Sequence, residues 1–246
     1  MDILLANDDG ILADGIRAMA RELMGSHRVV IAAPDSERSG ASHSITLTSP
    51  LRARQVELAG LEGVEAYSIN GAPADCVILA INALGIRPDL IISGINHGYN
   101  LGTDVHYSGT VSAAMEGALV GIPSMAVSMQ AVHSRDFSAA AGLAAELIPQ
   151  LMEGGSLLYN VNVPDLPGTE LKGIRYTPLS SRMYYAPFVR RTDPRNMDYF
   201  WWPGRVEYDG DMNADCDERW VLEGYATVTP LMQNMTDRAA LDTLNR

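Results

Sequence analysis

The sequence predicts an α/β protein: a Rossmann-like, doubly wound, mostly parallel sheet in a three-layer αβα arrangement, with a β-rich C-terminal extension. Short apolar runs without polar alternation are typical of strands buried on both faces. Segments of helical periodicity alternate with these runs, as they do in right-handed βαβ units. This alternation stops near Pro164, after which Pro, Arg and aromatic residues dominate. We therefore predict a Rossmann-like core over residues 1–163, and over residues 164–246 a β-rich extension that packs on the core and ends in an oligomerisation arm.

The first predicted strand is the apolar run at residues 3–6, which stops at residues 7–10, Asn-Asp-Asp-Gly. Gly10 permits the positive φ that a tight turn often needs. Ligands of open α/β sheets bind just beyond the carboxyl ends of strands, and a divalent cation can hold the adjacent carboxylates of Asp8 and Asp9 together. By itself, an Asp-Asp-Gly sequence is more often a solvated turn than a site.

The next segments continue the alternation of helix and strand. Long polar loops inside compact domains are usually functional or disordered. The predicted elements are a helix at 15–24, a strand at 29–33, a polar loop at 36–44, an alternating extended region at 45–69 with turns near Gly60 and Gly63, and a helix at 72–84.

The second half of the core begins with a strand at residues 90–93, which ends in a Gly- and Asn-rich segment at 94–102. The Ser-Gly-Thr sequence at 108–110 then opens a helix that is rich in small residues. The remaining predicted elements of the core are this helix at 111–120, a strand at 122–129, a helix at 137–152 and a strand at 157–161.

The extension lacks helical periodicity until its end. We predict extended segments within residues 206–230 and a closing helix at 236–244. Residues 199–202, Tyr-Phe-Trp-Trp, form a dense aromatic cluster, which is either a packed hairpin or a surface for a second subunit.

Composition narrows the classes of function. The chain has 246 residues, of which 47% are hydrophobic and 20% charged, as in an ordinary globular protein with a sizeable core. Its net charge of −12 argues against binding duplex nucleic acid, which requires clustered cations. The sole lysine, Lys172, lies far from any Gly-rich loop, which excludes a phosphate-binding P-loop.

The sequence also predicts a cytoplasmic protein without a membrane partner. The chain starts directly with a strand instead of an export signal, and no apolar run approaches membrane-spanning length. Cys76 lies in an apolar helical pattern and is expected to be buried, whereas Cys216 is expected in a polar loop. Neither cysteine has disulfide-framework or metal-ligand spacing, which favours a reducing compartment.

Three loops that follow strands carry polar residues which a doubly wound sheet would bring together. Carboxylate, hydroxyl and amide oxygens suit Mg²⁺ or Mn²⁺ and leave positions for water and a phosphate. The loops supply Asp8 and Asp9; Arg38, Ser39, Ser42 and His43; and Asn96 and Asn100, shortly followed by Ser108, Gly109 and Thr110.

The helix start at Ser108 is a candidate anion site because its backbone N–H groups are free of intrahelical partners and its dipole is positive. Taken alone, Ser108 is simply an N-cap. His43 is interpreted as a hydrogen-bonding loop residue and not as a catalyst.

Together, five motifs in order resemble the stationary-phase survival protein SurE family of nucleoside-monophosphate phosphatases. The resemblance is dense over the first 130 residues and continues at 160–164 and 223–225, with little between. The motifs are Asn-Asp-Asp-Gly at 7–10; Ala-Pro-Asp at 33–35 with Arg-Ser-Gly-Ala-Ser at 38–42; Gly-Ala-Pro-Ala-Asp-Cys at 71–76; Ser-Gly-Ile-Asn-His-Gly-Tyr-Asn-Leu-Gly at 93–102; and Tyr-Ser-Gly-Thr-Val-Ser-Ala-Ala-Met-Glu-Gly at 107–117.

The resemblance implies a Rossmann-like core, 5′- and 3′-nucleotidase activity, a cytoplasmic location, and homodimers or homotetramers joined through the C-terminal arm. It also implies one divalent cation per subunit, Mg²⁺ or Mn²⁺, whose ligands are Asp8, Asp9, Ser39 and Asn96. Two departures stand out: His97 occupies a variable position, and residues 180–220 match poorly.

Our hypothesis from the sequence is metal-assisted hydrolysis of nucleoside monophosphates, and of other phosphomonoesters, to an alcohol and phosphate. Asp9 would accept the proton of the attacking water. The catalytic residues are then Asp8, Asp9 and Asn96, and the residues that hold phosphate are Gly40, Ser108, Gly109 and Thr110, assisted by Asn100.

Two alternatives remain open at this point. Asp8 could act as a nucleophile through an aspartyl-phosphate, although phosphatases of that type carry Asp-x-Asp and not two adjacent aspartates. The same pocket could also belong to a non-catalytic nucleotide or phosphate sensor, which would bind nucleotide without turnover.

Overall fold

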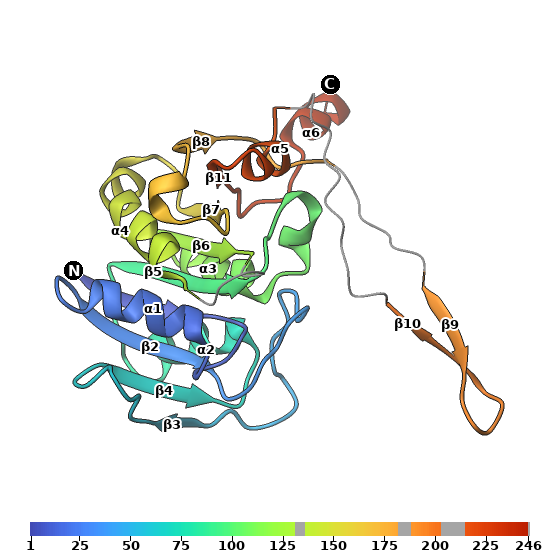
Figure 1. Cartoon of the computed structure of the whole chain (residues 1–246), viewed down its shortest axis with the longest axis horizontal. Coiled ribbons are helices and arrows are strands. Elements are labelled where there is room, and N and C mark those ends of the chain that lie inside the picture. The colour runs from blue at the N-terminus through green and yellow to red at the C-terminus, as the bar shows by residue number, and fades with distance from the viewer. Residues whose placement is uncertain (131–135, 182–187, 203–214, 246) are drawn as a thin grey trace.

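The computed structural model describes residues 1–130, 136–181, 188–202 and 215–245 (Figure 1). In this part of the chain, a nine-stranded sheet has the order β3-β4-β2-β1-β5-β6-β7-β11-β8, and β9 and β10 form a separate two-stranded sheet. The strands are β1 (Asp2–Ala6), β2 (Arg28–Pro34), β3 (Ala53–Gln55), β4 (Glu65–Ile69), β5 (Leu90–His97), β6 (Ser124–Met129), β7 (Leu158–Val163), β8 (Ile174–Tyr176), β9 (Val189–Thr192), β10 (Asp198–Trp201) and β11 (Ala226–Pro230).

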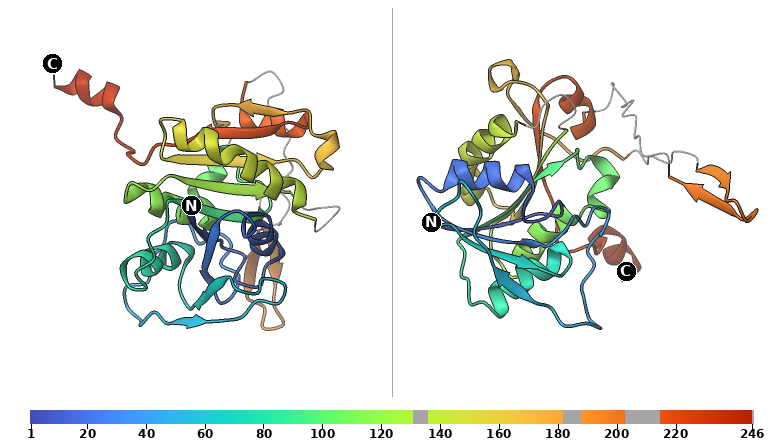
Figure 2. Two further views of the ribbon diagram at one scale, coloured as in Figure 1. Left: turned by 90° about the vertical axis from the view of Figure 1, so that its left-hand side faces the viewer. Right: turned by 60° about the horizontal axis from the view of Figure 1, so that its bottom comes forward.

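Helices cover both faces of the large sheet, which confirms the predicted three-layer arrangement (Figures 1 and 2). Helices α1 and α4 pack together on one face, where they share a core with β1, β2, β5 and β6. Helices α2 and α3 pack on the other face. The helices are α1 (Asp14–Leu23), α2 (Pro73–Asn82), α3 (Gly109–Leu119), α4 (Ser138–Glu153), α5 (Asp217–Leu222) and α6 (Arg238–Leu244), with short 3₁₀ turns η1 (Gly102–His106) and η2 (Gly168–Glu170).

The sheet is doubly wound about β1. From β1 the chain builds outward through β2 to β4 in one direction and through β5, β6 and β7 in the other, and all six strands are parallel. The direction of winding therefore reverses between β1 and β5. In such sheets the crevice at the carboxyl ends of these two strands is the usual binding site.

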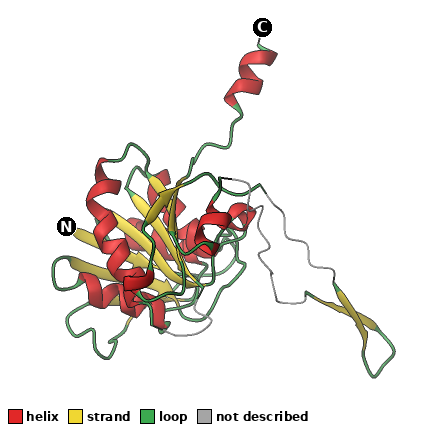
Figure 3. Cartoon of the chain, turned by 45° about the horizontal axis from the view of Figure 1, so that its top comes forward, coloured by secondary structure: helices red, strands yellow, loops and turns green. Residues whose placement is uncertain are grey.

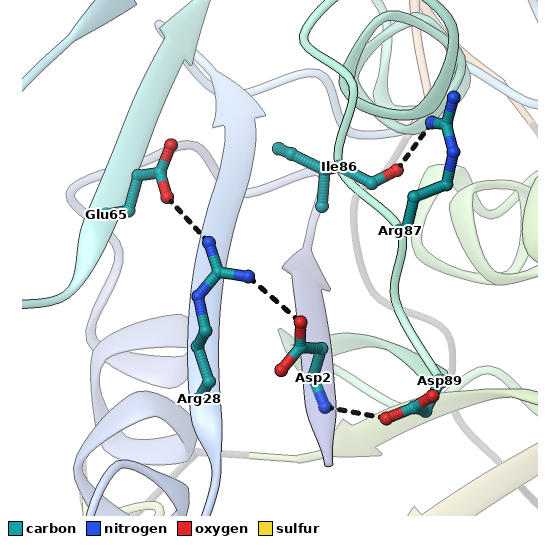
Figure 4. A network of polar contacts seen from close by, with 6 residues as sticks. All are labelled: Asp2, Arg28, Glu65, Ile86, Arg87 and Asp89. Atoms are coloured by element: carbon teal, nitrogen blue, oxygen red, sulfur yellow. Dashed lines mark hydrogen bonds and ion pairs between the residues drawn. The ribbon is translucent and has the colours of Figure 1, made fainter.

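At the opposite ends of the strands, where β1, β2, β4 and β5 begin, exposed polar contacts connect neighbouring strands (Figure 4). Arg28 at the start of β2 bonds to Asp2 of β1 at 2.9 Å and to Glu65 of β4 at 3.3 Å. The backbone N–H of Asp2 donates to Asp89, just before β5, at 2.8 Å. Because exposed ion pairs contribute little stability, we interpret this network as an alignment of strand beginnings, far from the candidate site.

The extension continues the central sheet. Strand β11 is antiparallel to β7, and β8 is parallel to β11, so both strands lie on the same sheet as the core. Strands β9 and β10 form an antiparallel hairpin that projects away from the body of the molecule, and every residue of the two strands is exposed (Figures 1 and 3). The aromatic cluster therefore lies in a hairpin that presents it to the surroundings.

The structure corrects the predicted extended segments at 206–230. Residues 217–222 form α5, 226–230 form β11, and 203–214 lie outside the described residues. Helix α5 was missed because its buried face includes the charged side chains of Asp217 and Glu218, so it has no apolar periodicity. Cys216, expected in a polar loop, is buried just before this helix.

Other predicted elements differ mainly at their ends. The alternating region at 45–69 contains only β3 and β4 as strands, and β5 continues four residues beyond its predicted end, to His97. The closing helix is present as α6, and Cys76 is buried as predicted. Among the described helices, none combines the length and apolar character required to cross a membrane.

Candidate active site

The turn after β1 is fixed by its own side chains and by the end of β2. The Asn7 side chain donates to the Gly10 carbonyl at 2.8 Å and accepts the Gly10 N–H at 3.2 Å. Gly10 has a φ of +99°, which L side chains rarely adopt. The N–H of Ile11 donates to the Pro34 carbonyl at 2.8 Å. This closed turn fixes the positions from which Asp8 and Asp9 project at the switch point.

Asp8 contacts the start of α3. Its carboxylate is buried and accepts a short hydrogen bond from the Thr110 hydroxyl. Burial raises the pKa of Asp8, and hydrogen bonds from Thr110 and from the Gly109 backbone partly oppose that rise. A Cβ on Gly109 would lie 2.8 Å from the Asp8 Cβ, so only glycine allows this approach. The structure thus brings together three of the predicted site residues.

Asp9 points toward the end of β5. Its carboxylate accepts the backbone N–H of His97 at 3.1 Å, and Asn96 precedes that residue. Burial is the main cause that raises the pKa of Asp9 to about 6, and the nearby charges of Asp8 and Glu37 raise it further. The two carboxylates are therefore held next to each other at an electrostatic cost.

Asn96 lies where β5 resumes pairing with β6 after an irregularity that follows Ser93. It is half-buried, and its side-chain amide donates to the Gly98 carbonyl at 2.9 Å. With its nitrogen bonded in this way, the amide oxygen of Asn96 is the atom suited to meet a cation.

Backbone hydrogen bonds connect the predicted loop after β2 to the turn after β1 and to the segment before α3. The N–H of Arg38 donates to the Asp8 carbonyl at 2.7 Å, and that of Ser42 donates to the Tyr107 carbonyl at 3.0 Å. Between these anchors, Gly40 has a φ of +69°, and Ser39 is exposed. The loop therefore runs from Asp8 to the residue before Ser108.

Ser39 is not turned to the carboxylate pair in this structure, because its hydroxyl donates to Glu37 at 2.6 Å. Glu37 was not among the residues that sequence reasoning selected. It lies within the polar loop, but nothing in the sequence indicated that its charge acts on Asp9. His43 makes a 2.5 Å contact with Glu116 of α3, consistent with its interpretation as a hydrogen-bonding loop residue.

Ser108 is the N-cap of α3, since its hydroxyl accepts the N–H of Val111 at 3.1 Å. The hydroxyl of this residue therefore serves the helix, while the helix start itself offers backbone N–H groups next to Asp8. α3 has eleven residues, and its dipole points toward the carboxylate pair and any anion bound there.

Asn100 lies in a buried polar network on β6 and β7. Its side-chain nitrogen donates to the Ser128 hydroxyl at 2.7 Å, and its N–H donates to Asn162 at 2.8 Å. Its carbonyl accepts from the side chains of Asn160 and Asn162. In this structure Asn100 supports the loop that leads to η1. The spacing of the two asparagines on β7 is a pattern that could have indicated such a network.

The donor set fits a hard cation. Among the described residues, neither Asp8 nor Asp9 forms an ion pair with Lys or Arg, and a further negative charge, that of Glu37, acts on Asp9. The described residues contain no group of three or more His, Cys, Asp or Glu side chains placed to hold a metal. Two carboxylates with hydroxyl and amide oxygens are the kind of set that Mg²⁺ and Mn²⁺ accept.

The chain is similar to known proteins in sequence and in fold. The family model described as survival protein SurE matches residues 3–186. A 5′-nucleotidase SurE of Synechococcus elongatus is 42% identical over 254 residues, covering 100% of this chain and 98% of the relative. A 5′-nucleotidase SurE of Gloeobacter violaceus is 46% identical over 241 residues, covering 96% and 91%. The crystal structure of the SurE protein from Aquifex aeolicus matches with a TM-score of 0.81 and 35% identity, covering 100% of both chains.

Proposed function

Because this chain belongs to the survival protein SurE family, we propose that its nucleotide phosphatase activity requires a divalent cation and acts on both 5′- and 3′-monophosphates of nucleosides. The observation that carries the proposal is the contact between the Asp8 carboxylate and the start of α3, with Asp9 beside it. A buried and a half-buried carboxylate side by side, next to a helix start that attracts anions, favour a positive centre between them.

The residues that would hold the cation are Asp8, Asp9, Asn96 and Ser39. For Ser39 this requires its hydroxyl to leave Glu37, its acceptor in this structure. When bound, Mg²⁺ or Mn²⁺ would neutralise charge on the phosphate and lower the pKa of a coordinated water.

Groups of the protein itself would bind the phosphate, orient the Asp8 carboxylate and accept a proton. Backbone N–H groups at the start of α3, which hydrogen-bond to Asp8 in this structure, would hold phosphate oxygens when substrate binds, together with the exposed loop at Gly40. Thr110 fixes the Asp8 carboxylate through its hydroxyl. Asp9, whose carboxylate lies at the end of β5 beside the proposed cation site, would accept the proton of the attacking water. Asp8 is buried and hydrogen-bonded by Thr110, which supports a role as a ligand over a role as the attacking nucleophile.

The proposal is tested by phosphate release from a panel of nucleoside 5′- and 3′-monophosphates with Mg²⁺, with Mn²⁺ and with EDTA. We expect release with either ion and a loss of at least about a hundred-fold with EDTA, because the two carboxylates would then repel the substrate phosphate. Turnover that is unchanged in EDTA would contradict the metal site. Nucleotide binding without turnover would favour a sensor, and a phosphorylated Asp8 peptide would favour the aspartyl-phosphate route.

We also propose that the chain forms a homodimer or homotetramer. The supporting observation is exposed apolar surface in two projecting parts: the β9–β10 hairpin and the C-terminal arm, residues 231–245. Such surface is characteristic of contacts between proteins. The exposed apolar side chains of the two parts include Phe200 and Trp201 at 60% and 63%, and Met235 and Leu244 at 84% and 83%.

Light scattering on micromolar protein is expected to give the mass of two or four subunits, each of 26.6 kDa. Replacing Phe200 and Trp201 together by serine should lower that mass if the hairpin forms an interface. The control is Leu12→Ser, which replaces an exposed apolar residue of the Rossmann-like part and should leave the mass unchanged. A monomeric mass for the unaltered chain would contradict the proposal.

A further inference from the structure

A second buried aspartate lies outside the proposed active site, at the start of α5. The side chain of Asp217 is fully buried. One carboxylate oxygen accepts the backbone N–H of Gly102 at 2.9 Å. The other oxygen accepts the backbone N–H groups of Ser180 at 2.7 Å and of Glu218 at 2.8 Å. Three backbone donors from three parts of the chain thus converge on one side chain.

The first of these donors leads directly to the helix start of the proposed site. Gly102 begins η1, and within that turn the Asp104 carbonyl accepts the N–H groups of Tyr107 at 2.9 Å and of Ser108 at 3.1 Å. Ser108 is the N-cap of α3, whose next two residues contact Asp8. The short backbone of η1, hydrogen-bonded to Asp217 at one end and to Ser108 at the other, therefore connects Asp217 to the groups proposed to hold phosphate.

The other donors belong to segments that flank the hairpin in the sequence. Ser180 precedes and Asp217 follows the segment that contains β9 and β10, and the N–H of Asp217 donates to the Pro178 carbonyl at 3.0 Å. The same place is closely packed against η1. A Cβ on Gly102, whose φ is +51°, would lie 2.8 Å from the Ser180 carbonyl oxygen.

Burying the Asp217 carboxylate costs free energy of folding. Burial raises the pKa of Asp217, while the three backbone donors oppose that rise. Among the described residues no Lys or Arg forms an ion pair with it. A carboxylate accepts all three bonds, whereas an apolar group in its place would leave three backbone N–H groups unpaired in the interior. A role that depends on the direction of its hydrogen bonds accounts better for an aspartate here.

We infer that Asp217 is a positioning residue for the phosphatase reaction: by accepting the Gly102 N–H, it fixes η1 and thereby the phosphate-binding start of α3. This inference rests on the proposed function of that helix start. Through Asp217, the extension would take part in the active site of the core. Ser180 and Asp217, which flank the hairpin in the sequence, meet at the same carboxylate.

Asp217→Asn tests the inference with little change of shape. An asparagine oxygen can retain the two donors, Ser180 and Glu218, but its NH₂ then faces the Gly102 N–H, so that bond is lost. We expect kcat/KM to fall about ten- to a hundred-fold, the range that a small misplacement of a site can cost. Inhibition by inorganic phosphate should weaken at least several-fold, and amide hydrogen exchange at residues 102–108 should accelerate.

The matched control is Asp215→Asn, the same change two residues earlier at an exposed side chain that accepts the Trp220 indole N–H at 2.5 Å. Its kcat/KM, phosphate inhibition and exchange should stay within about two-fold of the unaltered chain. If Asp217→Asn loses thermal stability but keeps its kcat/KM and phosphate inhibition, Asp217 is only structural and the inference is overturned.

Gly102→Ala is a second variant if Asp217→Asn does not fold. It leaves Asp217 in place and displaces η1 from the Ser180 carbonyl, so the same losses are expected, and their absence in a folded variant contradicts the inference. An unaltered chain that neither releases nor binds phosphate would instead overturn the proposed function, so the two failures are distinguishable.

Discussion

Asp9→Asn is expected to lower kcat/KM for nucleoside monophosphates by about a thousand-fold and, at the same time, to stabilise the metal-free protein. The loss of activity follows because Asn can neither accept the proton of water nor bring a negative charge to a cation. Its amide oxygen can still accept the His97 N–H that Asp9 accepts at 3.1 Å, so the local fold should persist. Activity measured with saturating Mn²⁺ separates weak metal binding from lost chemistry.

The gain in stability follows from the raised pKa of Asp9, about 6 against an ordinary value of 3.8. The folded protein binds a proton more tightly than the unfolded chain does, so the contribution of this group is fully present below pH 3.8 and is lost as the pH rises through 6. At pH 7 the ionised carboxylate therefore destabilises the metal-free fold, by about 1 to 2 kcal/mol after allowance for partial solvent screening.

Thermal unfolding in EDTA between pH 4 and pH 7 measures this effect. The advantage of the Asn variant over the unaltered chain should grow with pH and be largest at pH 7. Added Mn²⁺ should reverse the order, because only the unaltered chain gains the full stabilisation of a bound ion. Asp242→Asn, at an exposed position of α6, should follow the unaltered chain throughout. An Asp9 variant with unchanged activity and unchanged pH dependence would contradict the proposed site.

Gly15→Ala is expected to destabilise the fold by about 3 kcal/mol, the upper part of the range for overpacking. Gly15 lies in the first turn of α1, where the helix packs directly on the backbone of β5. A Cβ there would stand 1.9 Å from the Ile95 carbonyl oxygen and 2.9 Å from its carbon, so one of the two elements must move. Because Asn96 is the next residue of β5, kcat/KM should fall as well.

Gly142→Ala is the matched control, since it makes the same change in α4 at a position with no atom within 4 Å of the added Cβ. It should raise stability by up to about 1 kcal/mol, because alanine is the better helix former. Urea unfolding of the two variants beside the unaltered chain makes the comparison. Equal gains from both substitutions would show that α1 does not pack on β5 as described.

The sequence alone predicts most of the Rossmann-like core. Buried parallel strands and helices have different periods of apolar residues, and both patterns are local, so residues 3–6, 90–93 and 15–24 were placed without knowledge of their neighbours. The boundaries were less well predicted, as for β5, which runs on to Asn96 and His97 because pairing with β6 resumes there.

The extension was harder to predict because its stability depends on distant partners. Helix α5 begins with two buried carboxylates, Asp217 and Glu218, and no local pattern distinguishes them from a solvated turn. The partners of Asp217 at Ser180 and Gly102 lie 37 and 115 residues away along the chain. Sequence reasoning therefore found neither the helix nor the role inferred here for its first residue.

For the candidate site, the sequence by itself determined the chemical identity of the groups and their places near the ends of elements: Asp8 and Asp9 in the turn after one strand, Asn96 near the end of another strand, and Thr110 at a helix start. Only the tertiary structure decided which groups meet. It placed Asp8 against Thr110, bonded Ser39 to Glu37, and enclosed Asn100 among the side chains of β6 and β7. The physical reason is that turn and strand preferences act over a few residues, whereas hydrogen-bond partners and desolvation are set by segments that the sheet brings together from far apart in the chain.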